Sequence, residues 1–124
     1  MQTDKITAFI GNKWWHAAPG QVLIVPNNHI ENLYDMEPEY GHAVMDASIK
    51  IAQALRATYG CDGTSVRQHN EPAGNQVVWH YHMQVFPRYE GDNLYVRHKD
   101  TYAPTNEEMA EKAQKLKAWL AENT

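Results

Sequence analysis

The chain has 124 residues, of which 43% are hydrophobic and 21% charged, with a net charge of −4. These values are typical of one soluble domain, and the absence of a block of like charges argues against a protein that binds nucleic-acid polymers. No apolar run approaches the roughly 20 residues of a membrane span, and no signal peptide is visible at Met1. A single cysteine, Cys61, cannot form an internal disulfide and favours a reducing compartment, so we expect a cytoplasmic protein.

The first part of the chain predicts two strands. Residues 5–10 alternate in polarity and predict a short strand, which is followed by a turn at residues 11–12. Residues 21–25 predict a buried strand that ends at Pro26, because proline cannot donate a backbone hydrogen bond. Residues 27–36 are expected to form a loop or a short helical turn.

A long helix is expected next. Asp35 can cap it, Pro38 suits its first turn, and Gly60 can end it. Apolar residues recur between these signals at helical spacing: Tyr40, Val44, Ala47, Ile51, Ala54 and Leu55. Residues 63–69 then predict a strand, and residues 70–76 predict a loop.

The second half of the chain completes the predicted sheet. Residues 77–86 predict a strand that pairs with the one before it in antiparallel fashion. Residues 87–104 look irregular, with a short strand expected near residues 94–96. A last helix begins at Thr105, where Thr105 and Glu108 form a capping-box pattern. The sequence therefore predicts one α+β domain over residues 1–124, an antiparallel sheet with one long helix and a C-terminal helix.

Two histidines and a glutamine share one face of the strand expected over residues 77–86. Side chains two positions apart in a strand point the same way, so His80, His82 and Gln84 would line one face. The other face would be apolar or aromatic: Val77, Trp79, Tyr81, Met83 and Val85. A simple core does not need the polar face, so we expect the reactive site there.

One interpretation of this face is nucleophilic attack on phosphorus. A neutral imidazole presents a lone pair on one nitrogen when its other nitrogen donates to a carbonyl, and it can then form a covalent nucleotidyl-histidine. Positioned donors for the phosphoryl oxygens could come from the loop at Gly74, Asn75 and Gln76, and from Gln84.

Two other interpretations stay open from the residues alone. A His-x-His pair could bind zinc with a third ligand from His69, His29 or a carboxylate, although no HExxH or cysteine-pair pattern is present. Alternatively, both histidines could be buried and satisfied by backbone carbonyls.

Three segments resemble the histidine triad (HIT) family. Residues 19–33, PGQVLIVPNNHIENL, are similar to its PGHxLVxPxxHxxNL segment, and residues 68–76, QHNEPAGNQ, to the loop before its triad. Residues 80–89, HYHMQVFPRY, match its H-φ-H-φ-H-φ-φ signature and the following PRY except at one position. The resemblance covers roughly residues 6–94, with the three motifs in the family's order.

The resemblance implies a HIT-like α+β fold, a homodimer, and binding of nucleoside phosphates. Family members cleave or transfer nucleotidyl groups through a histidine intermediate. By position, His82 would be the nucleophile, and His80 would orient it. The same comparison suggests a set of substrate-binding residues: Asn70, Gln76, Asn75, Gly74, His29 and Asn12.

Gln84 stands where the family has its third histidine. An amide cannot protonate a leaving group, whereas an imidazolium can. The pattern is similar to the branch that contains galactose-1-phosphate uridylyltransferase and diadenosine tetraphosphate phosphorylase, which favours transfer to a phosphate-bearing acceptor. Val77 occupies a position where many members have Ser or Thr, and many members begin some way upstream of the first strand expected here.

We therefore expect a nucleotide hydrolase or nucleotidyltransferase acting at the α-phosphate of a dinucleoside polyphosphate, a nucleoside phosphoramidate or a similar substrate. No protein-bound metal or other cofactor is required in this interpretation, although Mg²⁺ could accompany a polyphosphate. The alternative is a nucleotide-binding protein with little or no turnover, because Gln84 and Val77 remove a proton donor and a leaving-group contact. No membrane or nucleic-acid partner is expected.

Overall fold

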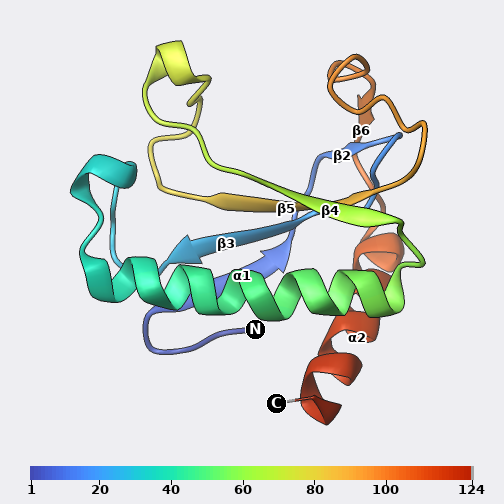
Figure 1. Ribbon diagram of the computed structural model, residues 1–124, viewed down its shortest axis with the longest axis horizontal. Coiled ribbons are helices and arrows are strands. Elements are labelled where there is room, and N and C mark those ends of the chain that lie inside the picture. Colours follow the sequence, from blue (N-terminus) through green and yellow to red (C-terminus); the bar gives the residue numbers. More distant parts are fainter. Residues whose placement is uncertain (124) are drawn as a thin grey trace.

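The computed structural model describes residues 1–123 and shows a four-stranded antiparallel sheet with a long helix lying across one face (Figure 1). In spatial order the strands are β1 (Ile6–Ile10), β3 (Val22–Pro26), β5 (Met83–Arg88) and β4 (Gly63–Arg67). Every neighbouring pair is antiparallel. The predicted α+β architecture is confirmed, and so is the antiparallel pairing of β4 with β5.

The helix on the sheet is α1 (Pro38–Thr58). Its buried side chains repeat every three or four residues: Val44, Ala47, Ser48, Ile51, Ala54 and Leu55. The apolar residues among them form the main core with apolar side chains of the sheet such as Ile24 and Val85. The helix ends as predicted, since Gly60 directly after the C-cap adopts a φ of +67°, which favours glycine.

The expected start of α1 needs a correction. Glu37 occupies the N-cap position and makes no side-chain cap hydrogen bond, whereas Asp35 lies in a short 3₁₀ turn, η1 (Leu33–Asp35). The side chain of Asn32 caps this turn by accepting a hydrogen bond from the backbone N–H of Tyr34. Asp35 therefore lies in the 3₁₀ turn and does not cap α1, whose first residue is Pro38.

The second helix, α2 (Asn106–Glu122), packs against α1 and β1 at one end of the sheet (Figure 1). Its predicted capping box is present. The Thr105 hydroxyl accepts from the Glu108 N–H, and the Glu108 carboxylate accepts from the Thr105 N–H. Leu116 and Leu120 are buried against the main core. Neither α1 nor α2, nor any other helix within residues 1–123, is long and apolar enough to cross a membrane.

The strand expected near residues 94–96 is absent, because this segment is folded into turns. Asp92 accepts a hydrogen bond from the Leu94 N–H, and the Val96 N–H donates to the Asn93 carbonyl. A short pairing of β2 (Trp14–Trp15) with β6 (Thr101–Tyr102) lies nearby, and the sequence did not predict it. The Trp15 ring meets Phe86 edge to face at 5.4 Å, so this ribbon is packed against β5.

The strand expected over residues 77–86 begins only at Met83, which is the main correction to the predicted sheet. The preceding residues bond to the loop after β3 instead: the Tyr81 N–H donates to the Ile30 carbonyl at 2.6 Å. Val77 and Trp79 are 82% and 45% exposed, not packed on the sheet as expected, whereas Tyr81 and Val85 are buried. His80 and His82 thus lie on the segment that enters the central strand.

Candidate active site

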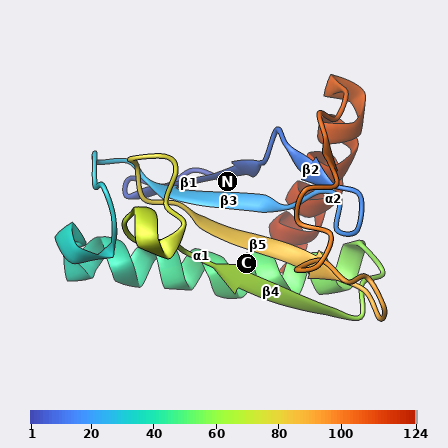
Figure 2. The ribbon, with the colours of Figure 1, turned by 90° about the horizontal axis from the view of Figure 1, so that it is seen from above.

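Two short turns frame the histidine segment. In both ribbon views, η1 and η2 (Pro72–Gly74) lie at the same end of the sheet (Figure 1, Figure 2). The Asn70 side-chain carbonyl accepts a hydrogen bond of 2.8 Å from the Leu33 N–H, and it also accepts one from the Gln68 amide. Asn70 therefore ties the loop after β4 to the loop after β3.

Gln76 strengthens the same connection from inside the loop, where it is 5% exposed. Its amide group donates to the Glu31 carbonyl at 2.7 Å and to the Val78 carbonyl at 3.0 Å. Its carbonyl oxygen accepts from the Glu71 N–H at 2.8 Å and from the Asn32 amide at 3.3 Å. The amide is thus occupied within the protein, which favours a role in holding the loop rather than in touching a substrate.

The backbone of this loop adopts conformations that most residues avoid. Glu71 and Asn75, on either side of η2, have φ values of 68° and 71°. Asparagine tolerates the left-handed region better than most residues, which explains its use at position 75. Both side chains are exposed, and Gly74 between them is partly buried. The loop is therefore held in a defined shape beside the histidines by its hydrogen bonds to the η1 loop.

The two histidines are fixed by main-chain carbonyls. His82 Nδ1 lies 2.9 Å from the His80 carbonyl oxygen, and His80 Nε2 lies 3.0 Å from the Pro26 carbonyl oxygen. A carbonyl can only accept, so each of these nitrogens carries the hydrogen. His82 Nε2 consequently bears the lone pair in the neutral ring, as a nucleophile requires.

Gln84 follows on β5 and contacts a second glutamine. Its amide donates to the Gln21 side-chain carbonyl at 3.2 Å, and the Gln21 amide in turn donates to the Lys13 carbonyl at 2.9 Å. Gln21 stands where the PGH motif has histidine, and Gln84 stands where the triad has its third histidine. The two glutamines that replace family histidines therefore contact each other. One N–H of Gln84 is used in this pair, and its second N–H can donate to a bound phosphoryl oxygen.

Arg67 is the last residue of the neighbouring strand β4, and His69 follows just beyond it. The sequence analysis considered His69 only as a possible zinc ligand and did not predict a role for Arg67. Burial, the guanidinium of Arg67 and the ring of His82 all lower the pKa of His69, while a hydrogen bond to the Asn75 backbone opposes them. His69 is thus within electrostatic reach of both Arg67 and His82. The sequence could have indicated this pair, because residues 67 and 69 lie two positions apart at the end of a predicted strand and would share one of its faces.

The remaining sequence-predicted residues lie at different distances from the histidines. The exposed ring of His29 stands edge to face against His80, with ring centroids 5.5 Å apart. Asn12 is exposed in the turn after β1, next to Gly11, whose backbone packs against Gln21. The structure thus brings His29 into the histidine cluster and leaves Asn12 at its outer edge.

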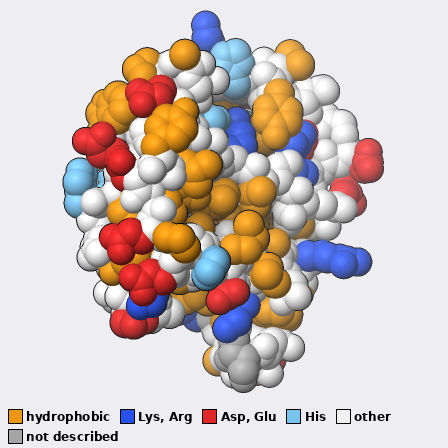
Figure 3. Space-filling view, turned by 60° about the vertical axis from the view of Figure 1, so that its left-hand side comes forward, with side chains coloured by type: hydrophobic (Ala, Val, Ile, Leu, Met, Phe, Trp, Pro, Cys, Tyr) orange, Lys and Arg blue, Asp and Glu red, His pale blue; other side chains and the backbone are white. Residues whose placement is uncertain are grey.

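Exposed apolar side chains accompany the site. Val77, Val78 and Trp79 directly precede His80 and are all exposed. Figure 3, in which the left-hand side of Figure 1 comes forward, shows hydrophobic side chains across the middle of that face, with histidine side chains among and beside them. An exposed indole next to a reactive segment offers a flat face on which a nucleobase can stack.

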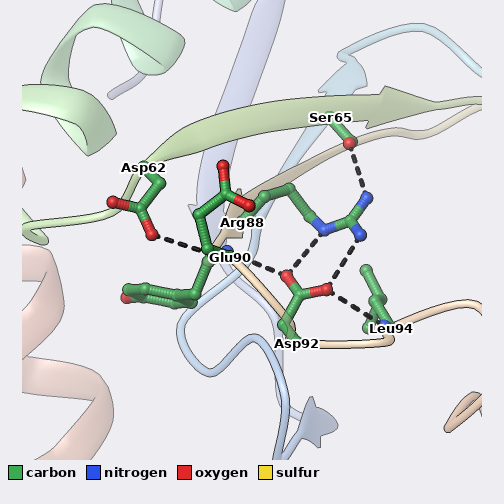
Figure 4. Close-up of polar contacts among 7 residues, drawn as sticks. Asp62, Ser65, Arg88, Glu90, Asp92 and Leu94 are labelled. Atoms are coloured by element: carbon green, nitrogen blue, oxygen red, sulfur yellow. Dashed lines mark hydrogen bonds and ion pairs between the residues drawn. The ribbon is translucent and has the colours of Figure 1, made fainter.

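A second polar cluster lies at the opposite end of β5. Asp92 accepts two hydrogen bonds from the Arg88 guanidinium, at 2.8 and 2.9 Å, and Arg88 also donates to the Ser65 hydroxyl (Figure 4). These bonds, first among several causes, hold the pKa of Asp92 well below its usual range. Asp92 also accepts from the N–H groups of Tyr89 and Leu94, so the cluster anchors the loop after β5.

Neither the cavity beside α2 nor a cluster of metal ligands belongs to the histidine site within residues 1–123. A cavity of about 520 Å³ lies between β1 and α2, and no site histidine lines it. Within residues 1–123, no three His, Cys, Asp or Glu side chains are grouped so that they could hold a metal ion.

Fold and site together define an α+β protein with carbonyl-anchored histidines at the entry to its central strand. Residues 1–91 match the HIT domain family, and the chain belongs to this family. It is 36% identical over 89 residues to the protein Hit of Bacillus subtilis, an alignment that covers 68% of this chain and 61% of that protein.

Two further comparisons extend this result. A crystal structure of a Hit-like protein involved in cell-cycle regulation from Bartonella henselae superposes with a TM-score of 0.81 at 32% identity, covering 95% of this chain and 82% of that one. Adenylylsulfatase HINT3 of Arabidopsis thaliana is 30% identical over 76 residues, which are 61% of this chain and 39% of that protein. The chain spans only about six tenths or less of the length of these curated relatives.

Proposed function

We propose that this protein is a nucleotide hydrolase or nucleotidyltransferase that acts at the α-phosphate of its substrate through a nucleotidyl-histidine on His82. One observation carries the proposal: His82 Nδ1 donates to the His80 carbonyl at 2.9 Å, which leaves Nε2 with a lone pair. The relationship to an adenylylsulfatase supports nucleotidyl chemistry. Dinucleoside polyphosphates, nucleoside phosphoramidates and similar nucleotides are the substrates we propose.

The proposed reaction has two displacements at phosphorus. His82 Nε2 attacks the α-phosphorus, a nitrogen–phosphorus bond forms, and the bond to the leaving group breaks with its electron pair on that group. The second N–H of Gln84 donates to a phosphoryl oxygen. The backbone N–H groups of Gly74 and Asn75 already donate to the Glu71 and Pro72 carbonyls, so we assign them no contact with the substrate. An oxygen of water or of a phosphate acceptor then attacks the phosphorus, and the nitrogen–phosphorus bond breaks with its electron pair on Nε2, which restores the neutral imidazole. When water is the acceptor, its proton passes to solvent. The residues named here supply these steps without a protein-bound metal, and Mg²⁺ would enter only with a polyphosphate.

The test combines product analysis with detection of the intermediate. Diadenosine tetraphosphate and adenosine 5′-phosphoramidate are each incubated with and without inorganic phosphate, and quenched protein is weighed by intact-mass spectrometry. We expect a nucleotidyl adduct in the native protein and none in His82→Ala. His42→Ala, which changes an exposed histidine of α1, is the matched control and should behave as the native protein. Turnover without an adduct would contradict the covalent route.

A second candidate function is nucleotide binding with little turnover. It is favoured by the Gln21–Gln84 contact, in which two amides occupy positions where an ionisable imidazole could transfer a proton. Tight binding of the same substrates, with no product and no adduct in the native protein, would establish this alternative.

We also propose that the protein is a homodimer. β4 is an edge strand, and three exposed apolar side chains lie on it and on α1: Met45, Ile49 and Val66. An edge strand beside an apolar helix surface suits pairing with a second copy. Light scattering on the native protein and on Val66→Lys should show loss of the dimer in the variant. A native monomer at all concentrations would reject the proposal.

A further inference from the structure

Gln84 stands at the position that, by the family resemblance, lies next to the departing group. Its amide is paired with that of Gln21. Neither amide titrates, so neither can supply a proton when the bond to phosphorus breaks. An amine leaves poorly without protonation, whereas the oxygen of a phosphate leaves readily as an anion.

A permanent cation lies directly across from this pair. Arg67 on β4 pairs with Gln84 on β5 in the antiparallel register. Directly paired residues share a face of the sheet, with Cβ atoms about 5 Å apart. His69 feels the charges of both Arg67 and His82. Arg67 is thus placed beside the reactive segment, on the face that carries Gln84.

Arg88, the other arginine on a strand, is paired with a carboxylate, whereas Arg67 forms no ion pair within residues 1–123. Arg88 is paired with Asp92, and Arg97 with Asp100, but no carboxylate within residues 1–123 pairs with Arg67. Its Nε is buried and makes no hydrogen bond in the described chain. The guanidinium carbon stands 4.5 Å from the Phe86 ring centroid and 5.6 Å from that of Trp15.

Three aromatic rings, those of Phe86, Trp15 and Tyr95, lie against the guanidinium without neutralising it. A planar cation with unused donors matches a phosphate group, which accepts two parallel hydrogen bonds. We infer that Arg67 recognises an anionic, phosphate-bearing leaving group or acceptor, so that this site prefers nucleoside polyphosphates over nucleoside phosphoramidates. The inference rests on the proposed function and names the substrate class of that same site.

The step balances without a proton donor. His82 Nε2 bonds to the α-phosphorus, and the electron pair of the broken bond stays on the bridging oxygen of the departing phosphate. That oxygen leaves as an anion next to Arg67, whose charge offsets it at any pH below its own pKa. In the return step, the same cation holds a phosphate acceptor for attack on the intermediate.

The kinetic test compares two leaving groups that both depart without protonation. Attack on diadenosine tetraphosphate at the α-phosphorus releases ATP through a phosphate oxygen, and attack on the 4-nitrophenyl ester of AMP releases a nitrophenolate. In Arg67→Met we expect kcat/KM to fall about 10- to 100-fold for the first, the usual effect of a lost hydrogen bond to a charged group. For the second we expect a change of less than about threefold, and Arg67→Lys should recover part of the loss. An equal fall for both substrates would overturn the inference.

A binding test separates this inference from the proposed catalysis. Calorimetry gives the Kd of AMP and of ADP for the native protein, for Arg67→Met and for Arg56→Met, a control on the exposed surface of α1. We expect ADP to bind more tightly than AMP except in Arg67→Met, where the ratio approaches one. If the ratio of the two Kd values is the same in Arg67→Met as in the native protein, the inference is overturned. If Arg67→Met abolishes the preference for ADP but the native protein forms no nucleotidyl adduct, the inference is retained and the proposed catalysis is rejected.

Discussion

The ring of His82 is held by the main-chain carbonyl of His80, at 2.9 Å, and the ring of His80 takes no part in that contact. The His80 ring donates instead to the Pro26 carbonyl on β3. The residue at position 80 therefore has two separable roles. Its backbone sets the tautomer of His82, and its side chain fixes the segment to the neighbouring strand.

This separation predicts unequal effects of the two histidine substitutions. His80→Ala keeps the carbonyl that accepts from His82, so we expect adduct formation to slow by about 10- to 100-fold through loosened orientation. His82→Ala removes the nucleophile and should slow the reaction by about a thousandfold or more. Single-turnover kinetics with intact-mass detection measures both rates. Equal losses in the two variants would show that the His80 ring acts directly on the reacting group.

Gln84→His tests the missing proton donor. A histidine at this position can protonate an amine leaving group, so hydrolysis of adenosine 5′-phosphoramidate should rise by at least about tenfold. Turnover of diadenosine tetraphosphate should change less, because a phosphate departs without protonation. Product chromatography on both substrates makes the comparison, and Gln84→Leu serves as the variant without any donor. No gain with the phosphoramidate would count against a leaving-group role for position 84.

Gln76→Leu tests the connection between the two loops. The change leaves the Glu71 N–H and the Glu31 carbonyl without their partner, so we expect the free energy of unfolding to fall by about 2–3 kcal/mol. Urea denaturation measures this loss. Gln53→Leu, at an exposed position of α1, is the control and should stay within about 0.5 kcal/mol of the native protein. A matching small effect of Gln76→Leu would mean that the loop does not depend on these bonds.

The Arg88–Asp92 pair predicts a specific dependence of stability on pH. Because the folded pKa of Asp92 is lowered, the pair stabilises the fold above the ordinary pKa of aspartate, about 3.9, and this stabilisation is lost as the pH falls toward the folded value. Asp92→Asn should cost about 2–4 kcal/mol near pH 7.

The cost of Asp92→Asn should stay constant down to about pH 5 and shrink below pH 4. Thermal unfolding of both proteins between pH 3 and pH 8 measures it, with Asp46→Asn on the exposed surface of α1 as control. A cost that does not change with pH would show that hydrogen-bond geometry, and not the carboxylate charge, stabilises this loop.

The sequence predicted the elements whose signals are local. The core positions of α1, its end at Gly60 and the capping box of α2 all follow from spacing and from single residues. The start of β5 did not follow, because it depends on hydrogen bonds to Glu31 and Ile30 in a distant loop. The pairing of Trp14 with Tyr102 escaped prediction for the same reason.

The candidate site shows the same division. The His-x-His spacing was visible in the sequence, but the sequence analysis did not identify the His80 carbonyl as the partner of the His82 ring, although the two residues are only two apart. The Gln21–Gln84 contact joins positions 63 residues apart, and only the register of the sheet sets Arg67 opposite Gln84. Contacts of this kind become visible only once the strands are paired.

The position of β5 between β3 and β4 determines when the site can form during folding. The helices need only local contacts, but the central strand needs two partners that are distant in sequence, and closing such loops is slow. We expect helical circular dichroism to recover before adduct formation when the unfolded protein is diluted from urea. Reactivity of His82 would thus report completion of the whole sheet, although the residue itself lies outside every strand.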